Sequence, residues 1–503
     1  MFVRKKRNQS GIISIQIIDK SSGKYKVLKT IGSSADILEV EQLFKDGQHW
    51  IKQHTKQTEI DLLGSQEMFN KFISNIRQVT VAGTDLLLGK LFQDIGFDQI
   101  KDKLFRQLVL SRLCFPVSKL RTIDYLKKYY AIDIDEDQVY RYLDKLYNKQ
   151  RDIVQQISYQ HTLKVLNNQI SIVFYDVTTL YFEIDDQDDL RKTGFSKEGR
   201  HQNPQIVLGL LVSVGGYPLA YEIFEGNKYE GHTMLPVINA FKKKYKLEKM
   251  VVIADSGLLS NDNITDLQAN GYEFILGARI KNEKQPLQKQ ILSLKLKNGE
   301  STVLKKDEQT QLVISYSLSR HKKDQTNREK GLLKLEKQIK SGRLTKSNIN
   351  NRGYNKYLKL DGEIKVAIDK DKFIADGKWD GLKGYLTNTS LTKDEVIENY
   401  NHLWRIEKAF RVSKHDLKIR PIYHRLHRRI EANVCIAFVA YKIFKELERK
   451  LYEMKASLSP EKAIEIAKTI YKLKIINPLN NEVVEQILIL NEEQKYLSKL
   501  FNF

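Results

Sequence analysis

One run of the sequence, ISIVFYDVTTLYFE (170–183), is almost continuously apolar, β-branched or aromatic. A run of this composition is typical of a β-strand that is buried on both faces. Asp176 lies in the middle of it. Because an unpaired carboxylate inside a buried strand is strongly unfavourable, Asp176 requires a partner or a metal ion. The run therefore predicts a central sheet that carries a charged group among its apolar side chains.

The residues that follow predict the rest of this sheet. PQIVLGLLVSVGGYPLAYEIFEGN (204–227) indicates two strands joined by a hairpin turn at its paired glycines. The next predicted elements are a helix (233–245), a strand in MVVIADSGLLS (250–260), a helix (263–270) and a strand in YEFILGARI (272–280). Three strands followed by alternating helices and strands predict an α/β fold, with an RNase H-like mixed sheet as its core and helices flanking it.

A second aspartate stands at the end of a predicted strand. The apolar run MVVIA ends at Asp255, and Ser256 and Gly257 break the strand directly after it. Active sites of α/β sheets gather at the C-terminal ends of their strands. A single aspartate at such a position is more often a helix N-cap. Both roles are therefore open for Asp255 when it is taken alone.

The stretch TKDEVIENYNHLWRIEKAFRVSK (392–414) predicts one helix, and Thr392 with Glu395 forms a capping-box pattern at its start. Six side chains recur at helical spacing on one face, namely Val396, Tyr400, Leu403, Glu407, Phe410 and Lys414. Glu407 is the carboxylate on this otherwise core-facing stripe. It either pairs with Arg411 at i,i+4, worth ~0.3–0.5 kcal/mol, or serves a buried site.

The balance of charge points to a polyanionic partner. Lys and Arg number 84 against 62 Asp and Glu, which gives a formal net charge of +22. This excess predicts binding to nucleic acid ahead of binding to an anionic membrane. No apolar run reaches the ~18 residues of a membrane span. The basic start MFVRKKRNQSG is followed by no apolar stretch of a signal peptide.

Cysteine usage bears on the compartment and on metal chemistry. The two cysteines, Cys114 and Cys435, both lie in apolar contexts. This predicts core residues of a protein in a reducing compartment, and it excludes a cysteine-based metal site. We therefore expect a cytoplasmic protein.

Changes in pattern along the chain predict six regions. They are a basic β-rich segment (1–60), a helical and predicted DNA-binding domain (61–168), the first part of the RNase H-like core (169–280), a partly β insertion domain (281–378), the second part of the core with the glutamate helix and a buttressing helix (379–450), and a C-terminal helical region (451–503).

Two of these regions have specific local patterns. The β-rich runs 11–18 and 24–31 flank a turn cluster and predict an N-terminal β-hairpin. Residues 117–147 indicate two short helices around an Asp-rich turn, the second starting at Asp135 or Asp137. They form either a helix-turn-helix that contacts DNA or a plain helical bundle with a charged solvated face.

Three carboxylates stand out together: Asp176 within a strand, Asp255 at a strand end and Glu407 on a helix. Oxygen-only ligands without a cysteine or clustered histidines suit Mg²⁺ or Mn²⁺. Two such ions about 3.5–4 Å apart activate an attacking oxygen and stabilise the leaving oxygen in phosphodiester chemistry. Any one of these acids has a common structural explanation. The three in this order, in a basic chain, favour a metal-dependent nucleic-acid enzyme.

The chain resembles insertion-sequence transposases of the DDE class, whose core is RNase H-like. The matching pieces are FYDVTTLYFE, GFSKEGRHQNPQIVLGLLVSVGGYPL, VVIADSGLLS and YNHLWRIEKAFRVSKHDLKIRPIYHR. The resemblance covers roughly residues 165–445. It is strongest to the branch whose glutamate helix carries a Tyr–Arg–Glu–Lys signature.

The resemblance implies that Asp176, Asp255 and Glu407 are the catalytic, metal-binding triad, with two Mg²⁺ or Mn²⁺ ions. The signature's tyrosine, glutamate and lysine match Tyr400, Glu407 and Lys414, whereas Leu403 replaces its arginine. Arg405 lies about 200° around a helix from Leu403, and Arg411 is on the face of the glutamate. The predicted DNA contacts are Tyr400, Arg405, Arg411 and Lys414. Tyr400 also fits a half-buried core tyrosine.

The implied activity is hydrolysis at terminal inverted repeats and attack of the freed 3′-OH ends on target DNA, by a cut-and-paste route. The implied partners are terminal-repeat and target DNA, with a homodimer assembled on paired ends. Two alternatives stay open. One is a structure-specific, metal-dependent DNA nuclease on the same fold, and the other is a catalytically silent DNA-binding protein of transposase origin.

Overall fold

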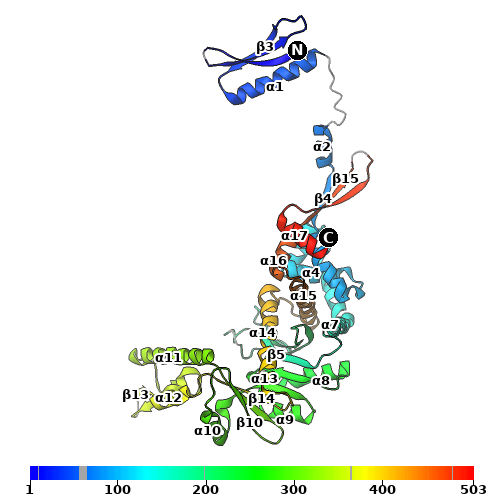
Figure 1. Ribbon diagram of the computed structural model, residues 1–503. Helices are drawn as coiled ribbons and strands as arrows, with labels where there is room; N and C mark the ends of the chain where they lie inside the picture. The colour runs from blue at the N-terminus through cyan, green and yellow to red at the C-terminus, as the bar shows by residue number, and fades with distance from the viewer. Residues whose placement is uncertain (10, 56–64, 197–198, 363–364, 478–479) are drawn as a thin grey trace. The chain divides into compact units, whose positions relative to one another are not determined.

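The computed structural model describes the chain except for residues 10, 56–64, 197–198, 363–364 and 478–479 (Figure 1). The chain divides into two compact units. The first comprises Met1–Val79 and Leu473–Gln486, and the second comprises Thr80–Lys472 and Ile487–Phe503. The first unit therefore draws on both ends of the sequence, and it continues beyond the predicted boundary at residue 60.

The first unit begins with an antiparallel sheet of β1 (Phe2–Arg7), β2 (Ile13–Asp19) and β3 (Lys26–Ser34), followed by α1 (Ile37–His54). The predicted hairpin is confirmed as β2 and β3, and β1 adds a third strand. Ile15 and Ile17 of β2 and Val40 of α1 are buried, because α1 contacts the sheet with its apolar side. Asp36 caps α1 by accepting a hydrogen bond from the backbone N–H of Leu38 at 2.7 Å.

A second sheet contains β16 (Val483–Leu488), β15 (Tyr471–Ile476) and β4 (Ile76–Val81) in that order, and α2 (Ser65–Ser74) precedes β4. The prediction of a helical region over 451–503 is therefore wrong for β15 and β16. It holds for α16 (Pro460–Ala467) and α17 (Glu492–Phe501). The strand segments YKLKII and VVEQIL are rich in β-branched residues, and β15 pairs with a strand from the other end of the sequence, which local periodicity does not reveal.

The second unit is built on an eight-stranded sheet of order β10-β11-β14-β9-β8-β5-β6-β7. In chain order its strands are β5 (Ile172–Tyr181), β6 (Gln205–Ser213), β7 (Pro218–Glu225), β8 (Val251–Ala254), β9 (Glu273–Ala278), β10 (Ser301–Lys305), β11 (Gln311–Tyr316) and β14 (Leu382–Thr387). Strands β5, β8 and β9 run parallel, and the other neighbours run antiparallel. The order of β7-β6-β5-β8-β9 confirms the predicted RNase H-like mixed sheet.

Helices cover both faces of this sheet. On one face, α8 (Met234–Tyr245) and α9 (Asn261–Ala269) share a buried apolar cluster with Val173 and Tyr175 of β5. On the other face, α14 (Trp404–Arg411) and α15 (His427–Glu453) share a cluster with Phe174 and Leu180. Successive side chains of a strand point to opposite faces, so β5 contributes alternately to the two cores.

The predicted helical domain packs around α15. Its helices are α3 (Lys90–Ile95), α4 (Lys103–Cys114), α5 (Lys119–Tyr130), α6 (Glu136–Lys145) and α7 (Arg151–Val165), and α4, α6 and α7 contact α15 directly. Asp135 is the N-cap of α6 and forms a capping box with Gln138. Of the two predicted starts of this helix, Asp135 and Asp137, the first is therefore confirmed. Within the described ranges, no helix has the length and apolar character needed to cross a membrane.

The predicted insertion, 281–378, divides into two parts. Its strands β10 and β11 extend the core sheet through β14, and α10 (Gln285–Ser293) precedes them. The remaining elements are α11 (Leu318–Lys340), β12 (Leu358–Asp361), β13 (Lys365–Ile368) and α12 (Lys370–Gly377). They have a small core of their own around Leu335, Tyr357 and Val366. After this second part the chain returns to the core sheet as β14, which leads to α13 (Lys393–Asn401).

Candidate active site

The register of β5 and β8 brings two of the predicted acids to neighbouring positions. The last paired residues of these parallel strands are Tyr175 and Ala254, so Asp176 and Asp255 are the next pair along. Adjacent strands lie about 4.8 Å apart. Phe174, two residues before Asp176, and Ile253, two before Asp255, belong to the same buried cluster as α14. By the two-residue alternation of a strand, Asp176 and Asp255 are at positions of the sheet face that α14 covers.

Asp255 is exposed at the point where β8 ends. Its Oδ1 accepts a hydrogen bond from the backbone N–H of Ser256 at 2.6 Å and one from the Tyr400 hydroxyl at 3.4 Å. The first bond makes it the N-cap of a short 3₁₀ turn, η5 (Ser256–Leu258). The structural role that is common for such an aspartate is therefore present, but the contact with Tyr400 ties Asp255 to a distant helix as well.

Asp176 is half-buried in β5, where its Oδ1 accepts a hydrogen bond from the backbone N–H of Val177 at 2.8 Å. Its strand neighbours Tyr175 and Val177 are buried. The partial exposure of Asp176 reduces the cost of its charge relative to full burial. The side chain of Asp176 is thus partly exposed, whereas those of its two neighbours in the strand are buried.

The predicted helix over 392–414 is interrupted, and the prediction of one continuous helix is wrong. Helix α13 ends at Asn401, α14 begins at Trp404, and a π-helical turn, η9 (Val412–Asp416), follows α14. Backbone N–H groups of Leu403, Arg405 and Ile406 donate to carbonyls three residues back, at 2.9, 2.9 and 3.1 Å. These tighter bonds are those of a 3₁₀ turn. The capping box of Thr392 and Glu395 is confirmed.

The interruption changes the environment of Glu407. A 3₁₀ turn advances about 120° per residue, against 100° in an α-helix, so the stripe predicted from 392 onward does not continue unchanged. Val396, Tyr400, Leu403 and Phe410 are buried, whereas Glu407 is exposed. In the described part of the chain, Glu407 and Arg411 do not form an ion pair with each other. The side chain of Glu407 is therefore available to a ligand.

Asp255 and Glu407 line one cavity of about 390 Å³. Its other walls come from β9, β14, α11 and the junction of α13 with α14, and include Gly277, Arg320, Lys383, Tyr400 and Leu403. Asp176 is not among the lining residues, and it adjoins this cavity through its register with Asp255. The structure therefore brings Asp255 and Glu407 together directly and places Asp176 on the next strand.

Tyr400 connects the acids to the sheet. It is 6% exposed, its ring packs edge-on against Tyr385 with centroids 5.0 Å apart, and the Lys383 ammonium lies 4.4 Å from its centroid. Burial raises the pKa of Tyr400, and the negative charge of Asp255 raises it further. The hydroxyl therefore stays protonated and donates to Asp255. Tyr400 is both a core tyrosine and a neighbour of the candidate site.

Lys383 and Arg320 are site residues that the sequence reasoning missed. Lys383 of β14 and Arg320 of α11 line the cavity with the two acids. Burial and the nearby Arg320 lower the pKa of Lys383, while Asp255 and Glu407 raise it, so its ammonium lies within the field of both carboxylates. A lysine inside the apolar strand GLKGYL was the available signal for Lys383. Arg320 lies within a basic run that resembles a solvated face.

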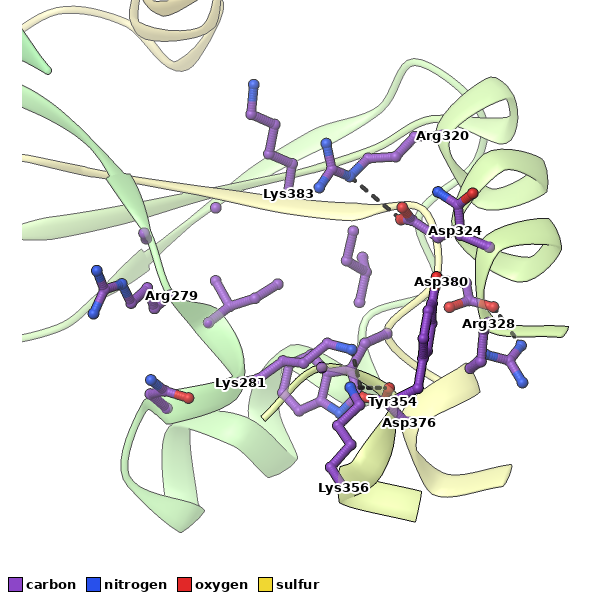
Figure 2. A pocket seen from close by; sticks show the side chains of 18 of the residues that line it. Arg279, Lys281, Arg320, Asp324, Arg328, Tyr354, Lys356, Asp376, Asp380 and Lys383 are labelled. Atoms are coloured by element: carbon purple, nitrogen blue, oxygen red, sulfur yellow. Dashed lines mark hydrogen bonds and ion pairs between the residues drawn. The ribbon is translucent and has the colours of Figure 1, made fainter. Parts of the chain in front are cut away.

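A second pocket of about 600 Å³ adjoins this cavity, and Arg320 and Lys383 line both (Figure 2). Most of its charges are paired. The ion pairs are Lys281–Asp376 at 2.5 Å, Lys356–Asp376 at 2.7 Å, Arg328–Asp380 at 2.5 Å and Arg320–Asp324 at 3.4 Å. Figure 2 shows these side chains around the pocket. Arg320, Asp324 and Arg328 come from α11 and Asp376 from α12. Lys281 and Lys356 come from the 3₁₀ turns η6 (Ile280–Asn282) and η8 (Gly353–Tyr357). The paired charges fix this wall beside the acids.

The other predicted DNA contacts lie outside the cavity. Arg405 is half-buried, with its guanidinium 5.7 Å from the Trp404 ring. Its Nε is buried and has no hydrogen-bond partner among the described residues. Arg411 is exposed at the end of α14, and Lys414 is half-buried in η9. Leu403, which replaces the signature arginine, is a wall of the cavity. At that position the chain therefore presents an apolar side chain to the acids.

The three candidate acids offer the type of ligand atom that a hard divalent cation binds. Asp176, Asp255 and Glu407 supply only carboxylate oxygens, the ligands that Mg²⁺ and Mn²⁺ prefer. Among the residues that the structure describes, no three His, Cys, Asp or Glu side chains are close enough to enclose a metal ion together. The arrangement is thus an open one, in which two acids share a cavity and the third is on the adjacent strand.

The closeness of Gly277 to Tyr400 gives a test of this packing. A Cβ at Gly277 would collide with the Tyr400 hydroxyl and approach the Ser256 backbone nitrogen at 3.0 Å. We expect Gly277→Ala to lower the free energy of unfolding by about 1–3 kcal/mol through overpacking, measured by urea denaturation. Adding Tyr400→Phe removes the colliding oxygen and should restore at least half of the loss. A double variant no more stable than Gly277→Ala would contradict this packing.

The family model and the solved structures that are similar to this chain are all of transposases. A family model described as a transposase DDE domain matches residues 167–443. No curated protein matches the chain. Among solved structures, a piggyBac transposase synaptic complex with hairpin DNA is similar over 81% of this chain and 80% of that chain, with 8% identity and a TM-score of 0.38.

Two further similar structures are Mos1 transposase complexes. A paired-end complex with the left transposon end has 12% identity and a TM-score of 0.16, and the match covers 46% of this chain and 66% of that one. A paired-end complex with Mn has 12% identity and a TM-score of 0.15, covering 46% and 72%. The assignment rests on the family model, which spans more than half of the 503 residues. This chain belongs to the DDE transposase family.

Proposed function

We propose that this DDE transposase serves an insertion sequence. It cleaves DNA at the terminal inverted repeats of the element and joins the freed 3′-OH ends to target DNA by a cut-and-paste route. The observation that supports this most is the cavity that Asp255 and Glu407 share, with Asp176 next to Asp255 in the strand register. The net charge of +22 supports a polyanionic substrate.

Asp176, Asp255 and Glu407 are the residues that would hold two Mg²⁺ or Mn²⁺ ions. Bound there, the ions would supply a nucleophile at neutral pH and stabilise the leaving oxygen of a phosphodiester. The chain's own groups position this centre. The Tyr400 hydroxyl donates to Asp255 and fixes one carboxylate orientation, and the open wall around Glu407 leaves its carboxylate accessible.

Lys383 and Arg320 are the cations best placed for the scissile phosphate. Both line the cavity, and Leu403 leaves its wall without the charge that the family signature provides there. We therefore assign the phosphate-binding role of the missing arginine to Arg320 and Lys383. Arg405, Arg411 and Lys414 lie outside the cavity, and we assign them to the DNA that flanks the cleaved bond.

Terminal-repeat DNA and target DNA are the proposed partners. Excision requires cleavage at both ends of the element, and a homodimer on paired ends provides one catalytic centre for each end. An enzyme of this kind acts on the nucleoid of a prokaryotic cell. The sequence bordering the coding region should then contain inverted repeats, which a search of the flanks for matched termini will detect.

Strand transfer distinguishes this function from a nuclease on the same fold. The full chain is incubated with Mg²⁺, labelled DNA carrying the terminal repeats, and a supercoiled target plasmid. We expect labelled ends to become covalently joined to the plasmid through their 3′-OH groups. Cleavage of the ends without any joined product would instead favour the structure-specific nuclease. Binding with neither cleavage nor joining in Mg²⁺ or Mn²⁺ would favour the silent DNA-binding protein.

A further inference from the structure

A third cavity, of about 700 Å³, is lined by none of the three acids. It is bounded by the end of α4, the start of α5 and the segment that follows η9. Its basic lining residues are Arg112, Lys119, Arg121, Lys418, Arg420 and His424. No Asp or Glu is among its lining residues within the described chain. A cavity whose walls are cationic without any acid is suited to an anion.

Two of these cations are buried. Lys119 is 7% exposed, and it forms neither an ion pair nor a side-chain hydrogen bond with any residue in the described ranges. Arg112 is also 7% exposed, and it donates to the Asn433 side-chain oxygen at 2.9 Å and to the Leu417 carbonyl at 3.5 Å. Burying a cation without an acid is costly, so this pair favours a negatively charged occupant.

No carboxylate of the described cavity lining stabilises the charged form of Lys119. Burial lowers the pKa of Lys119 well below its ordinary value, and the adjacent Arg112 lowers it further. His424 faces the same space and is kept neutral, because burial and the two cations lower its pKa to about 3. An anion between Lys119 and Arg112 would reverse this effect on Lys119 by attraction. The positive charge of the cavity is therefore not balanced by an acid in its described lining.

Its position relates it to the candidate active site. The backbone N–H of Ile422, in the lining segment, donates to the Tyr181 carbonyl at 3.1 Å, at the end of β5. Tyr181 is five residues beyond Asp176, which corresponds to about 17 Å of extended strand. That separation is too large for the cavity to hold the phosphate that the acids act on. It corresponds to roughly five base pairs of duplex DNA, at ~3.4 Å each.

We propose that this cavity binds a backbone phosphate of the DNA substrate, several nucleotides from the cleaved bond, with Lys119 and Arg112 as its ligands. The proposal rests on the proposed function for the identity of the polyanion. The exposed Tyr423 and half-buried Tyr140 at the cavity provide aromatic surface for the adjacent sugar or base. The volume of about 700 Å³ lies within the range of small-ligand pockets, roughly 300–1,000 Å³.

Lys119→Met tests the proposal, with Lys128→Met as the matched control. Lys128 is exposed on the same helix and does not line the cavity. The probe is a labelled 20-base-pair duplex, titrated with the full chain by fluorescence anisotropy at several salt concentrations. We expect Lys119→Met to weaken binding about fivefold to tenfold and to reduce the log–log salt slope by about 0.9, as loss of one phosphate contact predicts. Lys128→Met should change the affinity by less than twofold.

Thermal unfolding separates a binding lysine from a structural one. Removing an unpaired buried charge should leave the melting temperature of Lys119→Met without DNA equal to or above that of the wild type. The duplex should then raise the melting temperature of the wild type more than that of the variant. A variant that melts well below the wild type, with an unchanged salt slope, would make Lys119 a structural residue and overturn the proposal.

A small-anion arm identifies the source of the phosphate. Inorganic pyrophosphate is expected to protect the wild type weakly, to be displaced by the duplex, and to have little effect on Lys119→Met. Pyrophosphate that binds at this lysine without competition from the duplex would overturn the backbone assignment. Weakened duplex binding by Lys119→Met in a protein that cleaves no DNA would support the pocket and refute the proposed function. Normal duplex binding by Lys119→Met, in a protein that cleaves DNA, would refute the phosphate-binding pocket and support the proposed function.

Discussion

Replacing Glu407 by glutamine is expected to lower the rate of DNA cleavage by at least about 1000-fold, because a neutral amide holds a divalent cation poorly and metal stabilisation contributes several kcal/mol to the transition state. Asp176→Asn and Asp255→Asn should have comparable effects. Cleavage of terminal-repeat DNA in Mg²⁺ measures the loss, and the affinity for the same DNA should stay within a few-fold of the wild type. Removal of divalent ions by a chelator should abolish cleavage by the unmodified protein, and added Mn²⁺ should restore it.

Glu398→Gln is the control for these substitutions. Glu398 is an exposed glutamate of α13 that does not line the cavity, so the same loss of charge on the neighbouring helix should leave cleavage unchanged. If the three acid variants cleave as fast as Glu398→Gln does, the assignment of the triad is wrong.

Acidification is expected to destabilise the second unit strongly through His424. Burial and the neighbouring Lys119 and Arg112 lower the pKa of His424 from 6.5 to about 3 in the folded protein. Between these pH values the unfolded chain binds a proton that the folded chain does not. Stability from the neutral histidine is therefore complete above pH 6.5 and is lost as the pH falls towards 3. At about 1.4 kcal/mol per unit of pKa, the loss amounts to several kcal/mol.

His424→Gln removes this titration. The free energy of unfolding, measured by urea denaturation at pH 7 and at pH 4.5, should fall less between the two pH values in the variant than in the wild type. Any pH-independent effect of the glutamine on the free energy of unfolding cancels, because each protein is compared with itself at the two pH values. The control is His415→Gln, an exposed histidine of η9, which should retain the acid sensitivity of the wild type. An equal fall in His424→Gln and the wild type would contradict the buried, neutral state of His424.

The sheet was predictable because its signals are local. The apolar run around Asp176 and the strand ending at Asp255 predict buried strands from composition alone, and the order of elements between residues 170 and 280 predicts the RNase H-like arrangement. The pairing that makes Asp176 and Asp255 neighbours is not local. It depends on the register of β5 with β8, which is set by packing on both faces of the sheet.

The glutamate helix shows where periodicity fails. Spacing of residues from Thr392 to Lys414 predicts one α-helix, because a sequence pattern assumes a constant turn per residue. The 3₁₀ bonds at Leu403 and Ile406 change that turn, and they expose Glu407 while Val396 and Phe410 remain buried. The sequence therefore indicates Glu407 as a candidate acid, but it does not predict that the side chain is exposed.

The cationic half of the site depends on contacts between distant segments. Arg320 lies in a basic helix that by composition alone resembles a solvated surface, and only the addition of β10 and β11 to the core sheet explains its place beside Asp255 and Glu407. The same limit applies to Lys119, whose burial depends on the segment around His424. Charge runs predict a polyanionic partner but not which cations are held in a cavity.

Iron-mediated cleavage of the polypeptide tests whether Asp176, Asp255 and Glu407 hold divalent ions in one site. Fe²⁺ replaces Mg²⁺ in the full chain, and ascorbate with peroxide then generates hydroxyl radicals that cut the backbone near the bound ion. We expect three cuts, close to residues 176, 255 and 407. Excess Mg²⁺ should suppress all three, and Glu407→Gln should weaken all three together. Cuts confined to other segments, or cuts at the three positions that respond independently to Glu407→Gln, would contradict it.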